Sequence, residues 1–272
     1  MTADHTSKGT VVLVHGLWLT SRSWEHWVTR YTAAGYRVLT PEWPGMDADV
    51  ETTRKDPSAM NGLGVTEVAD HHEKFLRALD VKPMLIGHSF GGLVVQILLD
   101  RGLGSAGVAL HPAPPKGVLR LPLSALRSAF PVLHNPANRH KTVGLTPEQW
   151  HFSFTNNLSE AASQAAYTRY HVPAPGRPLF QAATANLAPG GATKVNYHNA
   201  DRAPLLLVSG SADNTVPASM VRENFTRYRK SRTVTELKEY PGRTHFTAGS
   251  PGWERVADDV LSWATRQRGV RP

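Results

Sequence analysis

Apolar and polar positions form two alternating patterns along this chain. Short runs rich in valine, leucine and isoleucine, typical of strands buried on both faces, alternate with longer segments whose apolar residues recur at helical spacing. This alternation predicts an α/β fold, in which a mostly parallel sheet of about six strands carries helices on both faces. The predicted strands are 10–16, 36–40, 82–89, 105–112, 204–210 and 234–240, and the predicted helices are 21–35, 66–80, 90–102, 217–229 and 252–266.

The pattern is interrupted in segment 113–200, where prolines are frequent and the helical patterns are short. This segment is too long to be an ordinary connection between two strands. We therefore expect a cap or lid at 113–200, inserted into one core domain that is formed by 1–112 and 201–272. The short helices predicted in the cap are 121–130, 146–154 and 159–170.

The composition is that of a folded protein. The chain has 272 residues, of which 40% are hydrophobic, enough for a sizeable core. It contains no cysteine, which excludes disulfides, thiolate metal sites and cysteine nucleophiles. Its histidines show no paired spacing with carboxylates, so we also expect no metal site.

The chain is basic, with a formal charge of +8. Lysine and arginine are spread along the sequence, with modest concentrations at 227–232 and at the C-terminal end, and no nucleic-acid-binding motif accompanies them. We interpret the charge as a solvated surface and expect no nucleic-acid partner.

The sequence carries no sign of membrane insertion. The first residues lack a basic segment followed by an apolar core, and no apolar run reaches transmembrane length. We expect a soluble, cytoplasmic protein with no membrane span, whose oligomeric state the sequence leaves open.

The segment PMLIGHSFGG, at 83–92, joins a buried strand to an apolar helix. Gly87 and Gly91 leave room for a sharp turn, which would aim the Ser89 hydroxyl away from the strand. The helix that begins at Phe90 directs free N–H groups and the positive end of its dipole at the same place. This segment is therefore a candidate nucleophile elbow.

The sequence G-H-S-F-G after an apolar strand, with His-Gly ending the first strand, resembles the serine hydrolases of the α/β-hydrolase fold, such as esterases and lipases. The resemblance extends from Thr10 to about Arg266 in element order. It implies a triad in the order serine, acid, histidine, with Ser89 as the nucleophile. Asp213 follows a later strand and His245 follows the last one, so they are the acid and the base that the resemblance implies.

The same resemblance implies an oxyanion hole made of two backbone N–H groups. We expect these from Phe90 and from Leu17, which follows the first strand, with Trp18 as the second choice for the latter. Trp18 is also a candidate for the wall of the substrate pocket. His111, at the end of a strand, and Trp150, in the cap, are further candidates for substrate binding.

The sequence departs from the family pattern in two places. The family often has D-x-P-G-x-G after the second strand, whereas this chain reads E-W-P-G-M-D at 42–47. The first recognisable strand begins at Thr10, which leaves no room for the two antiparallel strands that open larger members. We expect an altered loop at 42–47 and a trimmed sheet.

These features predict a serine hydrolase that cleaves carboxylic esters of small or medium-sized substrates through an acyl-enzyme on Ser89, without a metal or other cofactor. The same triad also serves lactonases, amidases, carbon–carbon bond hydrolases and cofactor-free perhydrolases. A small-molecule receptor with residual hydrolysis is the alternative outside catalysis.

Overall fold

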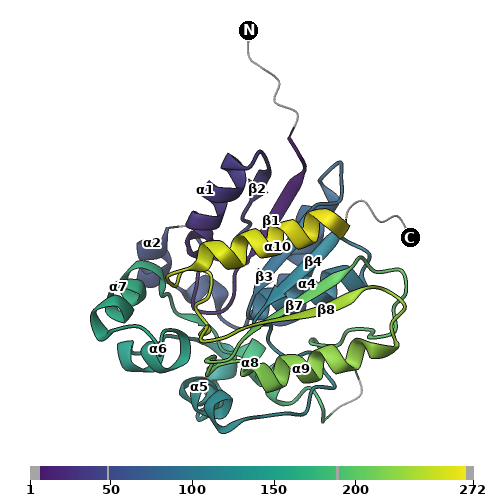
Figure 1. Ribbon diagram of the computed structural model, residues 1–272. Helices are drawn as coiled ribbons and strands as arrows, with labels where there is room; N and C mark the ends of the chain where they lie inside the picture. The colour runs from purple at the N-terminus through teal and green to yellow at the C-terminus, as the bar shows by residue number, and fades with distance from the viewer. Residues whose placement is uncertain (1–6, 48, 188–189, 268–272) are drawn as a thin grey trace.

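A six-stranded parallel sheet forms the centre of the protein (Figure 1). The computed structural model describes residues 7–47, 49–187 and 190–267, so part of the basic C-terminal stretch lies outside the described residues. The strand order is β2-β1-β3-β4-β7-β8, and all five pairs are parallel, which confirms the predicted fold class. The strands are β1 (Thr10–Val14), β2 (Arg37–Leu39), β3 (Met84–His88), β4 (Ala106–Leu110), β7 (Leu205–Gly210) and β8 (Thr235–Tyr240).

Helices cover both faces of the sheet. One face carries α1 (Glu25–Ala33) and α10 (Trp253–Gln267), and Figure 1 shows α10 crossing in front of the strands. The other face carries α3 (Val65–Arg77), α4 (Phe90–Asp100) and α9 (Ala218–Arg227).

The alternation of side chains along β1 explains the two layers. Val11 and Leu13 belong to the hydrophobic cluster of α1 and α10, whereas Val12 and Val14 belong to the cluster of α3, α4 and α9. Successive residues of a strand point to opposite faces, so an uninterrupted apolar run is what a sheet buried on both faces requires.

Between β4 and β7, the described residues form four short α-helices and a small antiparallel sheet of two strands. Three of the helices fall where the sequence predicts them, and α6 opens with a capping box between Thr146 and Gln149. Whether this segment acts as a separate cap stays a prediction. The elements are α5 (Leu123–Leu133), α6 (Pro147–Phe154), α7 (Glu160–Tyr170), α8 (Arg177–Ala183), β5 (Thr142–Val143) and β6 (Ala174–Pro175).

Two short helices were not predicted. They are α8 and α2 (Val50–Lys55). Pro178 lies in the first turn of α8, where a proline fits a helix although it interrupts the apolar pattern. The predicted helix at 21–35 differs too, because Ser21–Trp24 forms a 3₁₀ turn before α1.

Among the described residues, no helix is both long and apolar enough to cross a membrane.

Candidate active site

Ser89 occupies a strained turn between β3 and α4. Its backbone has φ 56° and ψ −121°, a conformation that residues other than glycine rarely adopt. The neighbouring glycines make the turn possible: a Cβ on Gly87 would lie 2.1 Å from the carbonyl oxygen of Gly91, and one on Gly91 would lie 2.2 Å from that of Val14. No larger residue fits at either position, and the turn has the geometry of a nucleophile elbow.

The structure brings together the three residues that the resemblance implies as a triad. The Nε2 atom of His245 lies 3.0 Å from the Oγ of Ser89, and its Nδ1 atom lies 2.8 Å from Oδ2 of Asp213. The three residues follow β3, β7 and β8, whose carboxyl ends share one edge of the parallel sheet. All three are buried, so few water molecules compete for these hydrogen bonds.

Asp213 is held as a carboxylate by several donors. Its Oδ1 atom accepts hydrogen bonds from the N–H groups of Thr215 and Val216, each at 2.8 Å. Burial alone would raise the pKa of Asp213, but the electrostatic interaction with His245 and the hydrogen bonds from His111 and His245 outweigh it, and this pKa lies well below its usual range. Asp213 can therefore orient the His245 ring while it stays ionised.

Two backbone regions with free N–H groups flank Ser89. Phe90 is the first residue of α4, where N–H groups have no partner within the helix. The loop after β1 is packed against the elbow, because a Cβ on Gly16 would lie 2.7 Å from the Cβ of Ser89. In the part of the chain that the structure describes, the N–H groups of Leu17, Trp18 and Phe90 donate no hydrogen bond.

A small apolar cavity opens beside Ser89. Its volume is about 130 Å³, and no charged side chain of the described residues lines it. Trp18 forms part of its wall, held by a hydrogen bond of 3.0 Å from its Nε1–H to the carbonyl oxygen of Val143. The segment between β4 and β7 contributes further lining residues, among them Ala125, Leu126, Ala129, Leu179 and Ala183.

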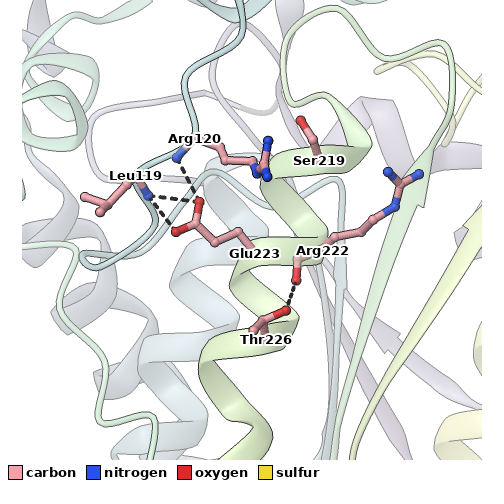
Figure 2. Close-up of a pocket in the computed structure, with 6 residues that line it drawn as sticks. All are labelled: Leu119, Arg120, Ser219, Arg222, Glu223 and Thr226. Atoms are coloured by element: carbon pink, nitrogen blue, oxygen red, sulfur yellow. Dashed lines mark hydrogen bonds between the residues drawn. The ribbon is translucent and has the colours of Figure 1, made fainter.

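Exposed apolar side chains surround this cavity on the α5 side. Leu121 is 59% exposed and Leu126 is 41% exposed, and both also line the cavity. Glu223 on α9 fixes the chain that leads into α5, because its carboxylate accepts hydrogen bonds from the N–H groups of Leu119 and Arg120 (Figure 2). Leu119 and Arg120 line a larger surface cleft of about 640 Å³, which no triad residue lines. Figure 2 shows the Leu119 side chain pointing away from α9.

His111 and Trp150 lie elsewhere than expected. Both are fully buried and neither lines the cavity. The Nδ1–H of His111 donates to Oδ2 of Asp213 at 2.7 Å, and Trp150 stacks on Phe154 with ring centroids 4.3 Å apart. A substrate held in this cavity would therefore not touch either side chain. No pattern in the sequence signals the contact of His111 with Asp213.

His88 packs beneath the elbow. Its Nε2–H donates to the carbonyl oxygen of His245 at 2.7 Å, and the two rings are 4.7 Å apart. Burial holds the pKa of His88 well below its ordinary value, so the ring is neutral. This contact ties the backbone of His245 to the end of β3.

The loop 42–47, which departs from the family pattern, contacts the loop after β1 through Glu42. The carboxylate of Glu42 accepts hydrogen bonds from the N–H of Ser21 and lies 3.1 Å from Nε2 of His15. The His15 ring stacks on Trp43 with centroids 5.4 Å apart. The glutamate that replaces the usual aspartate thus connects the loops after β1 and β2.

One cluster has the composition of a metal site. The ligand atoms of His111, Asp213 and His245 all lie within 4.8 Å of one another. However, each histidine Nδ1 is only 2.7 or 2.8 Å from Oδ2 of Asp213. Two ligands on a tetrahedral zinc ion are about 3.3 Å apart, so these distances fit hydrogen bonds and not shared coordination.

The sequence model described as "Alpha/beta hydrolase family" matches residues 11–259. The chain belongs to the alpha/beta hydrolase family. This alpha/beta hydrolase matches a monoacylglycerol lipase from Paleococcus ferrophilus with 23% identity and a TM-score of 0.67, over 96% of this chain and 95% of the other.

Two further structures resemble this alpha/beta hydrolase. One is an extracellular alpha/beta-hydrolase from a Paenibacillus species, with 22% identity and a TM-score of 0.68 over 93% of this chain and 98% of the other. The second is tomato methylketone synthase I, with 16% identity and a TM-score of 0.69 over 96% and 99%. At such identities these likenesses show a shared fold, whose members carry out different reactions.

Proposed function

We propose that this protein hydrolyses carboxylic esters through an acyl-enzyme on Ser89. The observation that carries the proposal is the continuous chain of hydrogen bonds from Ser89 through His245 to Asp213. A serine hydroxyl is a weak nucleophile unless an adjacent base takes its proton, and this arrangement supplies such a base.

In the proposed reaction, Nε2 of neutral His245 takes the proton of Ser89 as Oγ attacks the ester carbonyl carbon. The negative charge that develops on the carbonyl oxygen is stabilised by the N–H groups of Phe90 and Leu17, each of which contributes about 3 kcal/mol in the transition state. His245 then protonates the leaving alcohol. Water repeats these steps on the acyl-enzyme and regenerates Ser89, so the reaction requires no metal or other cofactor.

The cavity supports an uncharged substrate with a small or medium-sized apolar group. A charged group would lose its hydration there without gaining a partner, since no charged side chain of the described residues lines the cavity. The names of two proteins of the same fold, a monoacylglycerol lipase and the Arabidopsis methylesterase MES16, are consistent with ester substrates. The proposed partner is therefore a small molecule, and the cytoplasmic location stays a prediction from the sequence.

The test is hydrolysis of p-nitrophenyl esters from acetate to palmitate by the wild type and by Ser89→Ala. We expect wild-type activity to peak at one chain length and to fall by about a thousandfold or more in Ser89→Ala. Ser209→Ala is the matched control, because Ser209 is also buried and its hydroxyl has no hydrogen-bond partner in the described chain.

Activity that survives in Ser89→Ala would refute the assignment of the nucleophile. If the wild type hydrolyses none of these esters, the ester proposal fails. The same pair of proteins is then assayed on lactones, amides, carbon–carbon substrates and perhydrolysis, and the binding of small ligands without turnover is measured.

A further inference from the structure

Asp213 accepts hydrogen bonds on Oδ2 from two histidines and not from one. The Nδ1–H of His245 donates to this oxygen at 2.8 Å, and the Nδ1–H of His111 donates to it at 2.7 Å. The other oxygen is already used by the N–H groups of Thr215 and Val216. The carboxylate therefore has four donors among the described residues, two backbone N–H groups on Oδ1 and two histidines on Oδ2, and the proposed mechanism gives no role to the second histidine, His111.

The backbone at His111 is strained in a way that permits this contact. His111 has φ 47°, and the other non-glycine residues with positive φ among those described are Trp18 and Ser89, which both border the cavity. The N–H of His111 donates to the carbonyl oxygen of Val208 on β7 at 2.7 Å, which holds this conformation in place. Strain of this kind persists where the surrounding structure over-determines it, and it is frequent at functional sites.

His111 is a neutral donor. Its side chain is fully buried, and its Nε2 atom has no hydrogen-bond partner in the described chain. The titratable groups around the ring are Asp213, His245 and Arg243 from the loops after β7 and β8, and His88 from β3. Burial lowers the pKa of His111 in spite of the hydrogen bond to Asp213, so its one proton is on Nδ1.

We propose that His111 is a positioning residue, which holds Oδ2 of Asp213 and limits how strongly this oxygen supports a positive charge on His245. The proposal rests on the proposed function of the same site. A carboxylate oxygen with two donors carries less negative charge toward either of them than an oxygen with one donor. His111 thereby weakens the stabilisation that Asp213 gives to a proton on His245, because the two histidines share one acceptor oxygen.

Two variants separate this role from packing. His111→Asn keeps an N–H donor at the position of Nδ1 and tolerates a left-handed backbone. His111→Leu fills a similar volume but has no donor. We expect the acid limb of kcat/KM against pH to move up by about 0.5 to 1 unit in His111→Leu, because His245 then binds its proton more tightly. In His111→Asn we expect the acid limb of the pH profile to stay at its wild-type position. We expect KM to change little in both variants because His111 does not line the cavity.

A second readout requires no substrate. The protonation of His245 is followed by NMR on protein labelled with ¹⁵N-histidine, with its signals assigned from a His245→Gln variant. The quantity measured is the titration midpoint, the pH at which half of the His245 side chains carry the extra proton. We expect this midpoint to rise in His111→Leu and to stay unchanged in His111→Asn. Circular dichroism melting establishes that each variant is folded at the temperature of measurement.

An NMR midpoint that is unchanged in His111→Leu, or that moves equally in both variants, overturns the proposal and leaves His111 a packing residue. If the wild type cleaves no ester but the midpoint shifts in His111→Leu alone, the proposed function has failed and the positioning role stands.

Discussion

His245 lies 3.0 Å from the Oγ of Ser89 although 156 positions separate the two residues in the chain. The contact forms because β3 and β8 are parallel strands of one sheet and end at the same edge. Nothing in the local sequence around either residue requires it. The chemistry proposed for this protein therefore depends on the strand order of the whole sheet.

Asp213→Asn tests the part that the acid plays. The amide cannot accept the Nδ1–H of His245 with the same charge, so the ring loses its favoured tautomer. We expect kcat/KM to fall by about 10³- to 10⁴-fold with the fold intact. The exposed residue Asp201, changed to Asn, is the matched control and is expected to leave kcat/KM unchanged. A loss below about tenfold in Asp213→Asn would show that Asp213 does not orient the base.

Ala129→Phe tests the site of the acyl or alcohol group. Ala129 lines the cavity from α5, and a phenyl ring there would take up most of the volume of about 130 Å³. We expect kcat/KM for the longest accepted p-nitrophenyl ester to fall by about tenfold or more, while that for acetate stays within about threefold. Ala137→Phe, at an exposed position outside the cavity, serves as control. Equal losses for all esters would contradict this location.

Gly87→Ala tests the packing of the elbow. The added Cβ would lie 2.1 Å from a backbone oxygen, which cannot move away without displacing β3 or α4. We expect the free energy of unfolding in urea to fall by about 3 kcal/mol or more. At Gly144 the nearest atom to an added Cβ is 3.5 Å away, so Gly144→Ala is the control and is expected to change stability little. Similar stabilities of the two variants would refute the explanation.

We expect the folded protein to lose stability in acid because two of its histidines are buried. Burial lowers the pKa of His72 to about 4 and that of His171 to about 3. As the pH falls below about 6.5, the unfolded chain binds protons at these two side chains, whereas the folded chain does not until about pH 4 or 3. The free energy of unfolding therefore decreases between these pH values. Between pH 7.5 and pH 5, each of the two histidines is expected to lower the free energy of unfolding by about 2 kcal/mol.

The measurement is the free energy of unfolding of wild type and His72→Gln at both pH values. The variant should lose about 2 kcal/mol less than the wild type over this range. His134→Gln is a close control, because His134 also donates to a carbonyl oxygen four residues earlier, but it is exposed. If the free energy of unfolding falls equally in the wild type and in His72→Gln, His72 does not contribute to the loss of stability in acid.

The features predicted correctly from the sequence are those that depend on local spacing. The apolar run of β1 follows from burial on both faces, and Gly87 and Gly91 mark the sharp turn around Ser89. The position of Asp213 after β7 and of His245 after β8 agrees with the order that the family resemblance implies.

The features that the sequence could not predict depend on which elements become neighbours. His111 meets Asp213 because β4 pairs with β7, although about ninety residues separate the two strands in the chain, and because the backbone at 111 is left-handed. The sequence suggests Trp150 for the substrate pocket, as a large aromatic residue of segment 113–200, but it is buried against Phe154. Such partners are set by tertiary packing, which hydrophobic periodicity does not encode.

The most direct test of the central claim is covalent labelling of the protein with an alkyl fluorophosphonate, followed by peptide mass spectrometry. The account predicts one adduct per chain, on the peptide that contains Ser89, with no label in Ser89→Ala and slow labelling in His245→Ala. An adduct on another residue, or a wild type that the reagent does not label at all, would contradict the claim that His245 and Asp213 activate Ser89.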